Sequence, residues 1–325
     1  MHKFPVGVLG ASGYAGRELC LLIARHPHMD LRFASAHGQR GQTAHIGGKD
    51  LTFVASEDAP LGEAALVFSA LPHGTSLEWV KRAHGSGAKV VDLSSDLRPG
   101  HGVAINGKHV PYGLTELARD EVAGADLVAN PGCYPTAILL ALAPLMRRGM
   151  LEKGSTIAVT AASGVTGAGY TPKPELLFAE IAEDYRAYGV GNDHRHLAEM
   201  SAFLRANSVE NDLVFTPHLL PVARGILATI VVRLDRDPDA ETILDLWLKA
   251  YAGEPFIEIS KTTPSLHDVV RRNTVRISVA KAANTSTPTL IITSAIDNLT
   301  KGAAGQAVQN ANLMLGLKET SGLPA

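Results

Sequence analysis

The sequence predicts an α/β fold in two domains: a doubly wound parallel sheet, then a domain built on a mixed or antiparallel sheet. Early in the chain, short apolar strands alternate with helical segments, at residues 6–9, 31–34, 65–70, 89–93 and 127–129. This alternation is typical of a parallel sheet covered by helices on both faces. Later strands are longer and rich in Ile, Val and Thr, at residues 156–162, 213–216, 226–234, 275–279 and 289–296. Such strands favour a mixed or antiparallel sheet.

The chain of 325 residues is long enough for two domains, each with its own core. We expect the first domain to span residues 1–132 and to be completed by residues 298–325, whose helix at 306–315 returns to it. The second domain then spans residues 133–297, with helices at 197–206 and 240–251. One face of its sheet could form a subunit interface, so we expect a homodimer or a homotetramer.

Composition excludes several classes of function. The formal net charge of −2 gives no electrostatic basis for binding nucleic acid or an anionic membrane. Two cysteines are too few for a disulfide framework, and Cys20 falls in a predicted helix, where we expect it to be buried. The histidines lack metal-ligand spacing, so no metal site is expected. Because no signal pattern or long apolar stretch occurs, we expect a soluble, cytoplasmic protein.

A glycine-rich turn follows the first predicted strand. Residues 10–16 read GASGYAG and lead into a helix near residues 17–26. Glycines allow tight turning and close approach of backbone amides to a pyrophosphate, which the helix N-terminus also favours. The glycine spacing is a variant of the usual fingerprint, but its place between a strand and a helix predicts dinucleotide binding in a Rossmann-type domain. A purely structural turn is the alternative.

The end of the second predicted strand indicates which dinucleotide is bound. A site for NAD commonly places an acid there to bind the ribose 2′-hydroxyl, whereas an arginine suits the 2′-phosphate of NADP. Residues 35–40 read SAHGQR and contain no acid. Ser35 and Arg40 therefore favour NADP. In the alternative interpretation, Arg40 is only a solvated loop residue.

Cys133 lies at the start of a predicted buried helix. The run at 130–136 reads NPGCYPT, and an apolar stretch follows at 137–143. A thiol at a helix N-terminus feels the positive end of the peptide dipoles, which lowers its pKa and increases its thiolate fraction. This pattern predicts a nucleophile. A buried structural cysteine is the alternative.

These motifs together identify a resemblance that extends over the whole chain. The sequence resembles the N-acetyl-gamma-glutamyl-phosphate reductases, which belong with the aspartate-semialdehyde dehydrogenases in one superfamily. The most specific match is the segment 128–137 around Cys133. Further matches are residues 10–16, 92–98, 112–114 with Glu116, 163–169, 194–196 with Glu199, and 298–305.

The resemblance implies reduction of an acyl phosphate to an aldehyde in arginine biosynthesis, with NADPH as reductant and release of phosphate. Cys133 would attack the acyl carbonyl, and the resulting thioester would accept the hydride. The aminoadipyl analogue of a lysine route, one methylene longer, is an open alternative, because a methylene discriminates by only about 1–3 kcal/mol. Aspartyl phosphate reduction and a non-catalytic NADP-binding regulator are further alternatives.

The chemistry also needs an acid or base, and histidine titrates near neutrality. His194 and His196 are the candidates. Glu199 lies three residues after His196, so on a helix its carboxylate could orient that imidazole, which favours His196. In the alternative interpretation this segment is a solvated helix start with Asp193 as its N-cap.

The substrate carries a phosphate and a carboxylate, which arginines bind with paired hydrogen bonds. We expect Arg98 and Arg224 in this role, although either could form a structural ion pair. The loop at 163–169 has small residues that suit close approach to a ligand. We expect the cofactor contacts to lie in turns that follow strands or open helices: Gly10, Ser12, Gly13, Tyr14, Ala15, Gly16, Ser35, Arg40, Ser69, Pro72, Ser163, Gly164, Asn298, Lys301 and Gly302.

Overall fold

The structure is a computed structural model that describes residues 3–101, 104–105, 107 and 109–324. Residues 1–2 and 325, the ends of the expected first domain, lie outside the described residues. The chain forms two compact units, one of residues 1–132 with 302–324 and the other of residues 133–301. Residues 298–301 therefore lie in the second unit.

The first unit is built on a five-stranded parallel sheet in the order β2-β1-β5-β6-β7. These strands are β1 (Phe4–Leu9), β2 (Met29–Ala34), β5 (Leu66–Ser69), β6 (Lys89–Asp92) and β7 (Leu127–Ala129). The chain runs outward from β1 in both directions, so the strand order reverses between β1 and β5. In sheets of this type, ligands bind beyond the carboxyl ends of the strands at that point.

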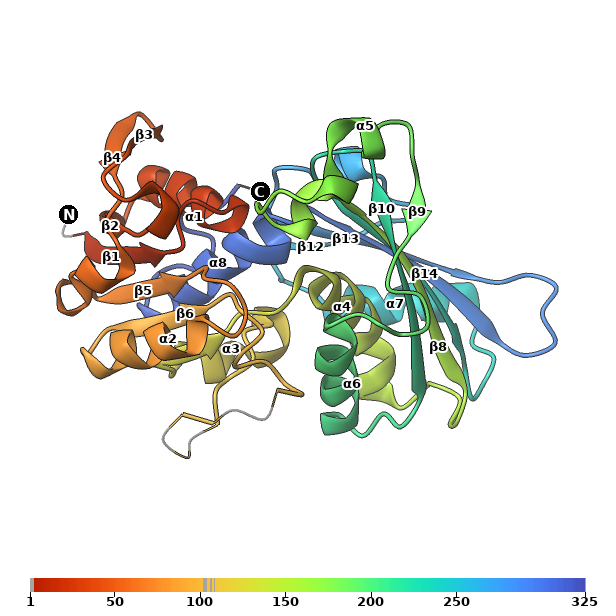
Figure 1. Ribbon diagram of the computed structural model, residues 1–325. Coiled ribbons are helices and arrows are strands. Elements are labelled where there is room, and N and C mark those ends of the chain that lie inside the picture. Colours follow the sequence, from red (N-terminus) through yellow and green to blue (C-terminus); the bar gives the residue numbers. More distant parts are fainter. Residues whose placement is uncertain (1–2, 102–103, 106, 108, 325) are drawn as a thin grey trace. The chain divides into compact units, whose positions relative to one another are not determined.

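Both faces of this sheet are covered by helices. Val6 and Val8 point to the face that packs against α1 (Tyr14–Arg25) and α8 (Gly305–Met314), which lie side by side in Figure 1. Val67 and Val90 point to the opposite face, where α2 (Ser76–Gly85) packs. The helix α3 (Thr115–Ala123) packs against α8. The doubly wound sheet, with the C-terminal helix returning to it, is as predicted.

One element of the first unit was not expected from the sequence. Strands β3 (Thr43–Ile46) and β4 (Lys49–Thr52) form a separate two-stranded antiparallel hairpin. Short 3-10 turns at His37–Gln39, Ser56–Asp58 and Leu61–Glu63 complete this region.

The second unit is built on a seven-stranded mixed sheet in the order β12-β13-β14-β11-β8-β10-β9. Its long strands are β8 (Thr156–Gly164), β10 (Asp212–Leu220), β11 (Ile226–Arg233), β13 (Val275–Lys281) and β14 (Thr289–Ile296). The short strands β9 (Arg186–Ala187) and β12 (Ile257–Ile259) form its edges. The predicted mixed sheet is confirmed, because β8 and β10 pair in parallel whereas β11 and β14 pair antiparallel.

Helices cover one face of this sheet. They are α4 (Cys133–Arg148), α6 (His196–Ala206) and α7 (Ala240–Ala250), and α4 packs directly on β11 and β14 (Figure 1). Between β8 and α6 lie 3-10 turns at Val165–Ala168 and Pro174–Leu176 and the short helix α5 (Phe178–Ile181). A further 3-10 turn spans Leu266–Asp268, and Thr300–Ala304 form a π-helical turn before α8.

The helix α4 contains Pro144, which has no amide hydrogen to donate to the carbonyl of Leu140. The Tyr251 hydroxyl donates to this carbonyl instead. One residue further along, the Trp247 indole N–H donates to the carbonyl of Ala141 at 3.1 Å. Side chains of α7 and its C-cap thus bind the α4 backbone at the position where proline interrupts it.

Among the described residues, the helices are all too short or too polar to span a membrane. The helix α4 begins at Cys133, four residues before the apolar stretch that predicted it. Its buried side chains run from Tyr134 to Met146.

We predict that Gly16→Ala destabilises the first unit. A Cβ at Gly16 would lie 2.2 Å from the Gly10 carbonyl oxygen and 2.7 Å from the Ala11 Cα, and both are backbone atoms. Overpacking of this kind costs about 1–3 kcal/mol. Urea denaturation measures the loss.

Gly13→Ala is the matched control in the same turn, because its nearest contact would be 3.7 Å away. The control should lose less stability than Gly16→Ala. Equal losses would show that the close backbone approach at Gly16 is not the cause.

Candidate active site

Cys133 is the first residue of α4 and is half-buried. The first-turn amides of a helix lack intrahelical acceptors, and the helix dipole is positive at this end. A thiolate is stabilised in such a position. The predicted location of the thiol at a helix start is confirmed.

A cluster of rings lies next to Cys133 in the second unit. Its members come from α4, β10, the start of α6 and the segment after β9, and we call them the ring cluster: Tyr134, Tyr188, His194, His196 and Phe215. The ring centroids of His194 and His196 are 4.9 Å apart, and that of Tyr134 lies 5.6 Å from His194. Phe215 lies 5.1 Å from Tyr134 and 5.3 Å from His194.

Two tyrosine hydroxyls of this cluster feel the charge of Cys133. The hydroxyl oxygens of Tyr134 and Tyr188 are 3.1 Å apart. Burial raises the pKa of Tyr188 to about 12, and a charge on Cys133 contributes to the increase. The pKa of Tyr134 is also raised, first by burial and in smaller part by Tyr188 and Cys133. Both hydroxyls therefore stay protonated at neutral pH and can donate hydrogen bonds next to the thiol.

His194 is held as a neutral imidazole. Its Nδ1 accepts a hydrogen bond from the backbone N–H of His196 at 3.1 Å, so the proton of the neutral ring lies on Nε2. Burial lowers the pKa of His194 to about 4, with a further contribution from Arg195 that Asp193 partly opposes. At neutral pH this ring can donate from Nε2 but does not carry a charge.

His196 and Glu199 lie one turn apart at the start of α6, and both are buried, with 3% and 0% of their surface exposed. The alternative interpretation, a solvated helix start with Asp193 as N-cap, is wrong. The N-cap is Arg195, and the ring of His194 provides the acceptor at this helix end.

The structure adds Tyr185 and His218 to the site, which sequence reasoning missed. Their rings stack at 5.0 Å with an angle of 15° between the planes. The His218 carbonyl accepts from the Tyr134 hydroxyl at 3.4 Å. His218 belongs to strand β10 and Tyr185 precedes the two-residue strand β9, and no local pattern marks either residue as part of a site. The one sequence signal for this part of the site is Tyr134, which directly follows the predicted nucleophile Cys133.

Three loops meet at one end of the second sheet. They are residues 163–166, 222–225 and 297–300. The Gly225 N–H donates to Asn298 Oδ1 at 2.8 Å, and the Asn298 amide donates to Thr166 Oγ1 at 2.9 Å. A Cβ at Gly164 would lie 2.8 Å from the backbone of Ala223, so glycine is needed there. Ser163 also hydrogen-bonds Tyr134, which places this end of the sheet next to Cys133.

The two predicted substrate arginines lie in different settings. Arg98 is buried in the first unit, and its guanidinium donates to the backbone carbonyls of Asn130 at 2.8 Å and Leu93 at 2.6 Å. These bonds fix the orientation of the Arg98 guanidinium in the first unit. Arg224 lies in the second unit, where its Nη1 is 3.3 Å from Asp297 Oδ2, and 15% of its side chain is exposed.

The glycine turn of the first unit is tightly built. Gly10 has a φ of +79°, and a Cβ there would lie 2.6 Å from the Ala70 carbonyl oxygen. Ser35 is fully buried, and its hydroxyl accepts from the Gly10 N–H at 3.3 Å while it contacts the Ser56 hydroxyl at 2.9 Å. The buried Ser35 side chain therefore stabilises the glycine turn through its hydrogen bond to Gly10.

The remaining predicted cofactor residues divide into three groups by exposure. Arg40 and Pro72 are exposed, and Arg40 forms an exposed ion pair with Asp58 at 2.7 Å. Half-buried residues along the glycine turn are Ser12, Gly13, Tyr14 and Ala15. The buried group consists of Ser69, Ser163, Gly164, Asn298, Lys301 and Gly302. Lys301 has no exposed surface, and its Nζ lies 5.6 Å from the Phe256 ring centroid.

The turn at residues 10–16 suits a dinucleotide. It precedes the N-terminus of α1, and a Cβ at Gly13 would meet a single backbone oxygen at 3.7 Å, so its outer side is open. The first amides of a helix lack intrahelical acceptors, and this position suits an anion. The residues present therefore fit a pyrophosphate.

Comparisons with known proteins identify the family. Residues 5–125 match the model of the semialdehyde dehydrogenase NAD binding domain, and residues 133–298 match that of the semialdehyde dehydrogenase dimerisation domain. An N-acetyl-gamma-glutamyl-phosphate reductase of Salinispora arenicola is 42% identical, covering 98% of this chain and 97% of its own. That of Desulforudis audaxviator is 39% identical with the same coverage. The chain belongs to the N-acetyl-gamma-glutamyl-phosphate reductase family.

Solved structures of the wider semialdehyde dehydrogenase family share the fold of this reductase family member. Aspartate semialdehyde dehydrogenase II of Vibrio cholerae superposes with a TM-score of 0.78 at 21% identity, covering 97% of this chain and 99% of its own. The Candida albicans aspartate semialdehyde dehydrogenase with NADP gives a TM-score of 0.70 at 17% identity, covering 96% and 98% of the two chains.

We predict that stability falls as the pH is lowered from 6.5 towards 4. The pKa of His194 in the folded chain is about 4, whereas an unperturbed histidine has a pKa of 6.5. Between these values the unfolded chain binds more protons, so stability present above pH 6.5 is lost as the pH falls. Burial also lowers the pKa of His26, which adds an effect of the same sign.

His194→Asn should weaken this pH dependence, measured as the urea midpoint at several pH values. His267→Asn, at an exposed position, is the control for removal of a histidine. An unchanged dependence in His194→Asn would contradict the neutral state of this ring.

Proposed function

We propose that this protein reduces N-acetyl-gamma-glutamyl phosphate to N-acetylglutamate 5-semialdehyde with release of phosphate, in arginine biosynthesis. Family membership over the whole chain supports this substrate. The observation that carries the proposal is the half-buried Cys133 at the start of α4, next to the two tyrosines and two histidines of the ring cluster. This arrangement suits nucleophilic attack on an acyl carbonyl.

The reaction proceeds in two stages on Cys133. The thiolate forms a bond to the acyl carbon, and the carbon–oxygen bond to phosphate breaks, which leaves a thioester. NADPH, when bound, would supply the hydride that reduces the thioester carbonyl carbon. The resulting alkoxide expels the thiolate, and the aldehyde leaves. The chain must activate the thiol, stabilise the negative oxygen and exclude water.

The two histidines have different roles in this proposal. His194 stays neutral with its proton on Nε2, so it acts as a hydrogen-bond donor towards developing negative charge. His196 is the acid or base, and Glu199 is its positioning residue one turn along α6. Because His194 stays neutral near pH 7 and is a weak base, His196 is the better candidate for the acid or base.

The first unit binds the cofactor in this proposal, and the second carries catalysis and substrate binding. The turn at residues 10–16 holds the pyrophosphate, while Ser35 supports the turn. Arg40 binds the 2′-phosphate of NADPH, for which it must exchange its exposed partner Asp58. Comparing KM for NADPH and NADH in Arg40→Ala tests this role, and equal increases would exclude it.

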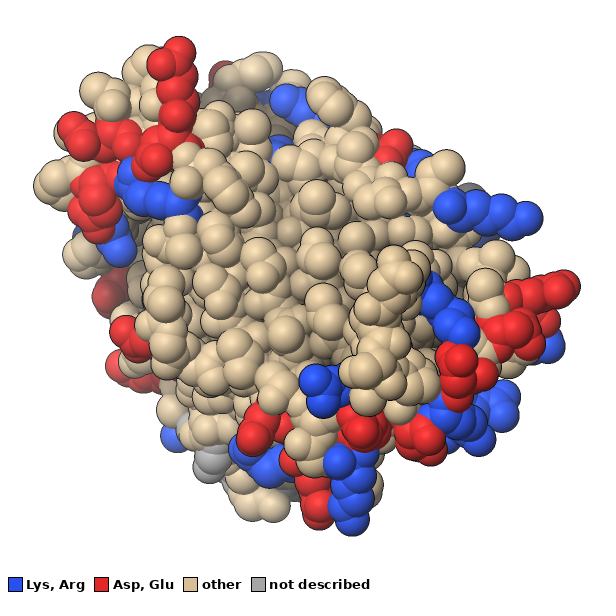
Figure 2. Space-filling view, turned by 90° about the vertical axis from the view of Figure 1, so that its right-hand side faces the viewer, with Lys and Arg blue, Asp and Glu red and all other residues tan. Residues whose placement is uncertain are grey.

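The uncovered face of the second sheet supports self-association. Aligned residues form an apolar row across five strands, Val214, Ala158, Val231, Ile291 and Ala280, and beside it a hydroxyl row, Thr216, Thr160, Thr229, Thr293 and Ser278. Val214 is 46% exposed, and Val231 and Ile291 are 37% exposed. Figure 2, seen from the side of the second unit, shows a broad surface with most charged side chains at its rim.

We propose that a second copy of the chain covers this face in a homodimer or homotetramer, in line with the dimerisation-domain match of residues 133–298. Like rows of apolar and hydroxyl side chains can pair with their own copies across a twofold axis. Sedimentation equilibrium tests the proposal. A monomer at micromolar concentration would exclude it.

We predict that Cys133→Ala abolishes reduction, by roughly 10⁴-fold or more, because no other group can form the thioester. The reverse reaction of aldehyde, phosphate and NADP⁺ is followed by NADPH absorbance. NADPH binding, measured by fluorescence, should stay near that of the wild type. Cys20→Ala is the matched control, since Cys20 is a fully buried core thiol whose pKa burial raises to about 12.

Activity that survives in Cys133→Ala would exclude the thioester mechanism. Turnover of the wild type on the aminoadipyl and aspartyl analogues identifies the substrate. A higher kcat/KM for either analogue than for N-acetyl-gamma-glutamyl phosphate would make that analogue the substrate.

We predict that His196→Asn lowers kcat by about 10² to 10⁴, as expected for a lost acid or base. His194→Asn should have the smaller effect on kcat, because a neutral donor contributes without transferring a proton. Steady-state kinetics and the pH profile of kcat separate the two variants. A larger loss in His194→Asn would reverse the assignment.

A further inference from the structure

Asp297 is a fully buried carboxylate that follows strand β14. Its Oδ1 accepts from the N–H groups of Leu299 and Thr300, both at 2.8 Å. These bonds cap the helical turn that begins at Thr300. A buried carboxylate also needs a compensating positive charge. Asp297 therefore has a structural function at Oδ1 and a second function at its other oxygen.

The second oxygen, Oδ2, connects two arginines. It accepts from the Arg271 backbone N–H at 2.7 Å and from the Arg224 guanidinium Nη1 at 3.3 Å. Arg224 comes from the loop at 222–225, and Arg271 comes from the segment before β13. One buried atom thus fixes the position of two arginines that are far apart in sequence.

Arg271 has a strained backbone. Its φ is +67°, in the left-handed region that disfavours residues with a Cβ. Such outliers persist where the surroundings hold them, and they cluster at functional sites. The hydrogen bond to Asp297 holds this residue. Its side chain is exposed, and among the described residues its guanidinium has no hydrogen-bond or ion-pair partner.

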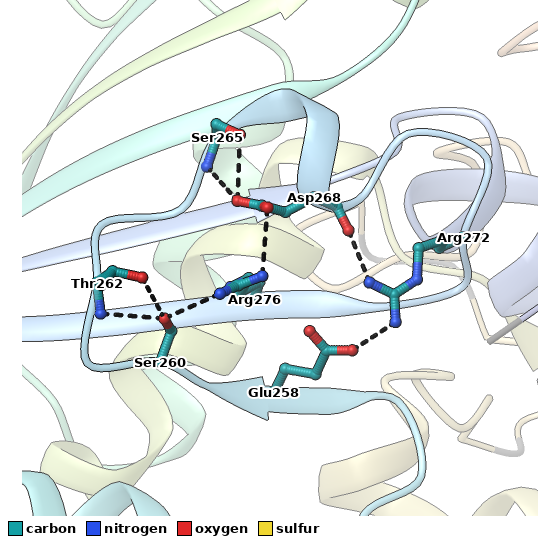
Figure 3. A network of polar contacts seen from close by, with 7 residues as sticks. All are labelled: Glu258, Ser260, Thr262, Ser265, Asp268, Arg272 and Arg276. Atoms are coloured by element: carbon teal, nitrogen blue, oxygen red, sulfur yellow. Dashed lines mark hydrogen bonds and ion pairs between the residues drawn. The ribbon is translucent and has the colours of Figure 1, made fainter.

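Neighbouring arginines are used differently. Figure 3 shows Arg272 bound to Glu258 and to the Asp268 carbonyl, at 2.6 and 2.8 Å. Arg276 pairs with the Asp268 carboxylate at 3.3 Å. These contacts hold the segment 258–276 together, so both guanidinium groups serve the fold. Arg271 differs from Arg272 and Arg276, because its guanidinium binds no internal acceptor among the described residues.

We propose that Asp297 positions Arg224 and Arg271 as a two-arginine subsite for an oxyanion of the substrate. The ligand class is a phosphate or a carboxylate, and the acyl phosphate has both. The subsite rests on the proposed function. The location of the subsite supports the proposal. Asn298, which follows Asp297, hydrogen-bonds the loop at 163–166. Ser163 of that loop contacts Tyr134, the residue after Cys133. Arg224 and Arg271 bind substrate, and Asp297 is the positioning residue.

The decisive variant is Arg271→Gly. Glycine accepts the left-handed backbone and keeps the N–H that donates to Asp297, so this variant should fold with an unchanged or higher midpoint temperature. Loss of a charge-assisted contact should raise the KM for one oxyanion by about 10-fold or more. Ser208→Gly, at an exposed residue with a φ of +60°, is the matched control and should keep wild-type KM values.

The reverse reaction distinguishes the two sources of the oxyanion. A higher KM for inorganic phosphate in Arg271→Gly assigns the subsite to the phosphate, and a higher KM for the aldehyde assigns it to the carboxylate. Either result supports the proposal. Values equal to those of Ser208→Gly, or a change confined to the KM for NADP⁺, would overturn it.

Asp297→Asn provides a second test. It should raise the same KM, and Arg271→Gly added to it should increase that KM little further, because both changes act on one subsite. Additive effects would contradict a shared action through Asp297. An inactive wild type would refute the proposed function, whereas an active wild type with an unaffected Arg271→Gly would refute the subsite alone.

Discussion

The second unit depends on one constraint inside the buried helix α4, a backbone carbonyl that proline leaves without its helical donor. Pro144 leaves the Leu140 carbonyl without its helical donor, and an unpaired carbonyl inside a protein costs about 1–3 kcal/mol. Tyr251 and Trp247 supply hydrogen bonds at this point, so α7 is fixed against α4 by more than apolar contact. The helix is thereby held rigidly at its middle, while its first residue, Cys133, remains half-buried at the end. Rigidity of this kind keeps a nucleophile in one place.

The loops at the end of the second sheet are held by backbone contacts. Gly164 lies against the backbone of Ala223, where a side chain would not fit. Asn298 bonds both the Gly225 N–H and the Thr166 hydroxyl. Positions on these loops are therefore set by the main chain and a few buried amides and carboxylates. Such positioning suits a site in which arginines and histidines must keep their geometry as charge develops.

Much of the fold could be predicted from the sequence because apolar periodicity reports burial. Strands β7 and β14 have the bounds that the pattern indicated, and the parallel first sheet follows from alternation of strands and helices. The hairpin of β3 and β4 is largely exposed, and its strands of four residues each carry only one or two apolar side chains. The helix α4 starts at Cys133, as the Pro-Gly turn before it indicated, although its first turn includes the polar residues Tyr134 and Thr136.

The chemical centre could be predicted only in part. Cys133 and the histidine pair stand in distinctive local runs, whereas Tyr188 and His218 reach Tyr134 through tertiary packing that no local pattern encodes. The buried bonds of Arg98 to backbone carbonyls also depend on how distant segments meet. No local pattern in the sequence marked Asp297 as a site residue, because an acid near a turn is common in any sequence. Its full burial and its four donors are what set it apart.

The place of α8 in the first unit has a consequence for the order of folding during synthesis. The five parallel strands are complete once residue 129 has been made, yet Val308 and Ala311, which cover one of their faces, are made only after the whole second unit. Until then the nascent sheet exposes an apolar surface, and the second unit can fold first. The first unit is thus completed only after the second has been synthesised.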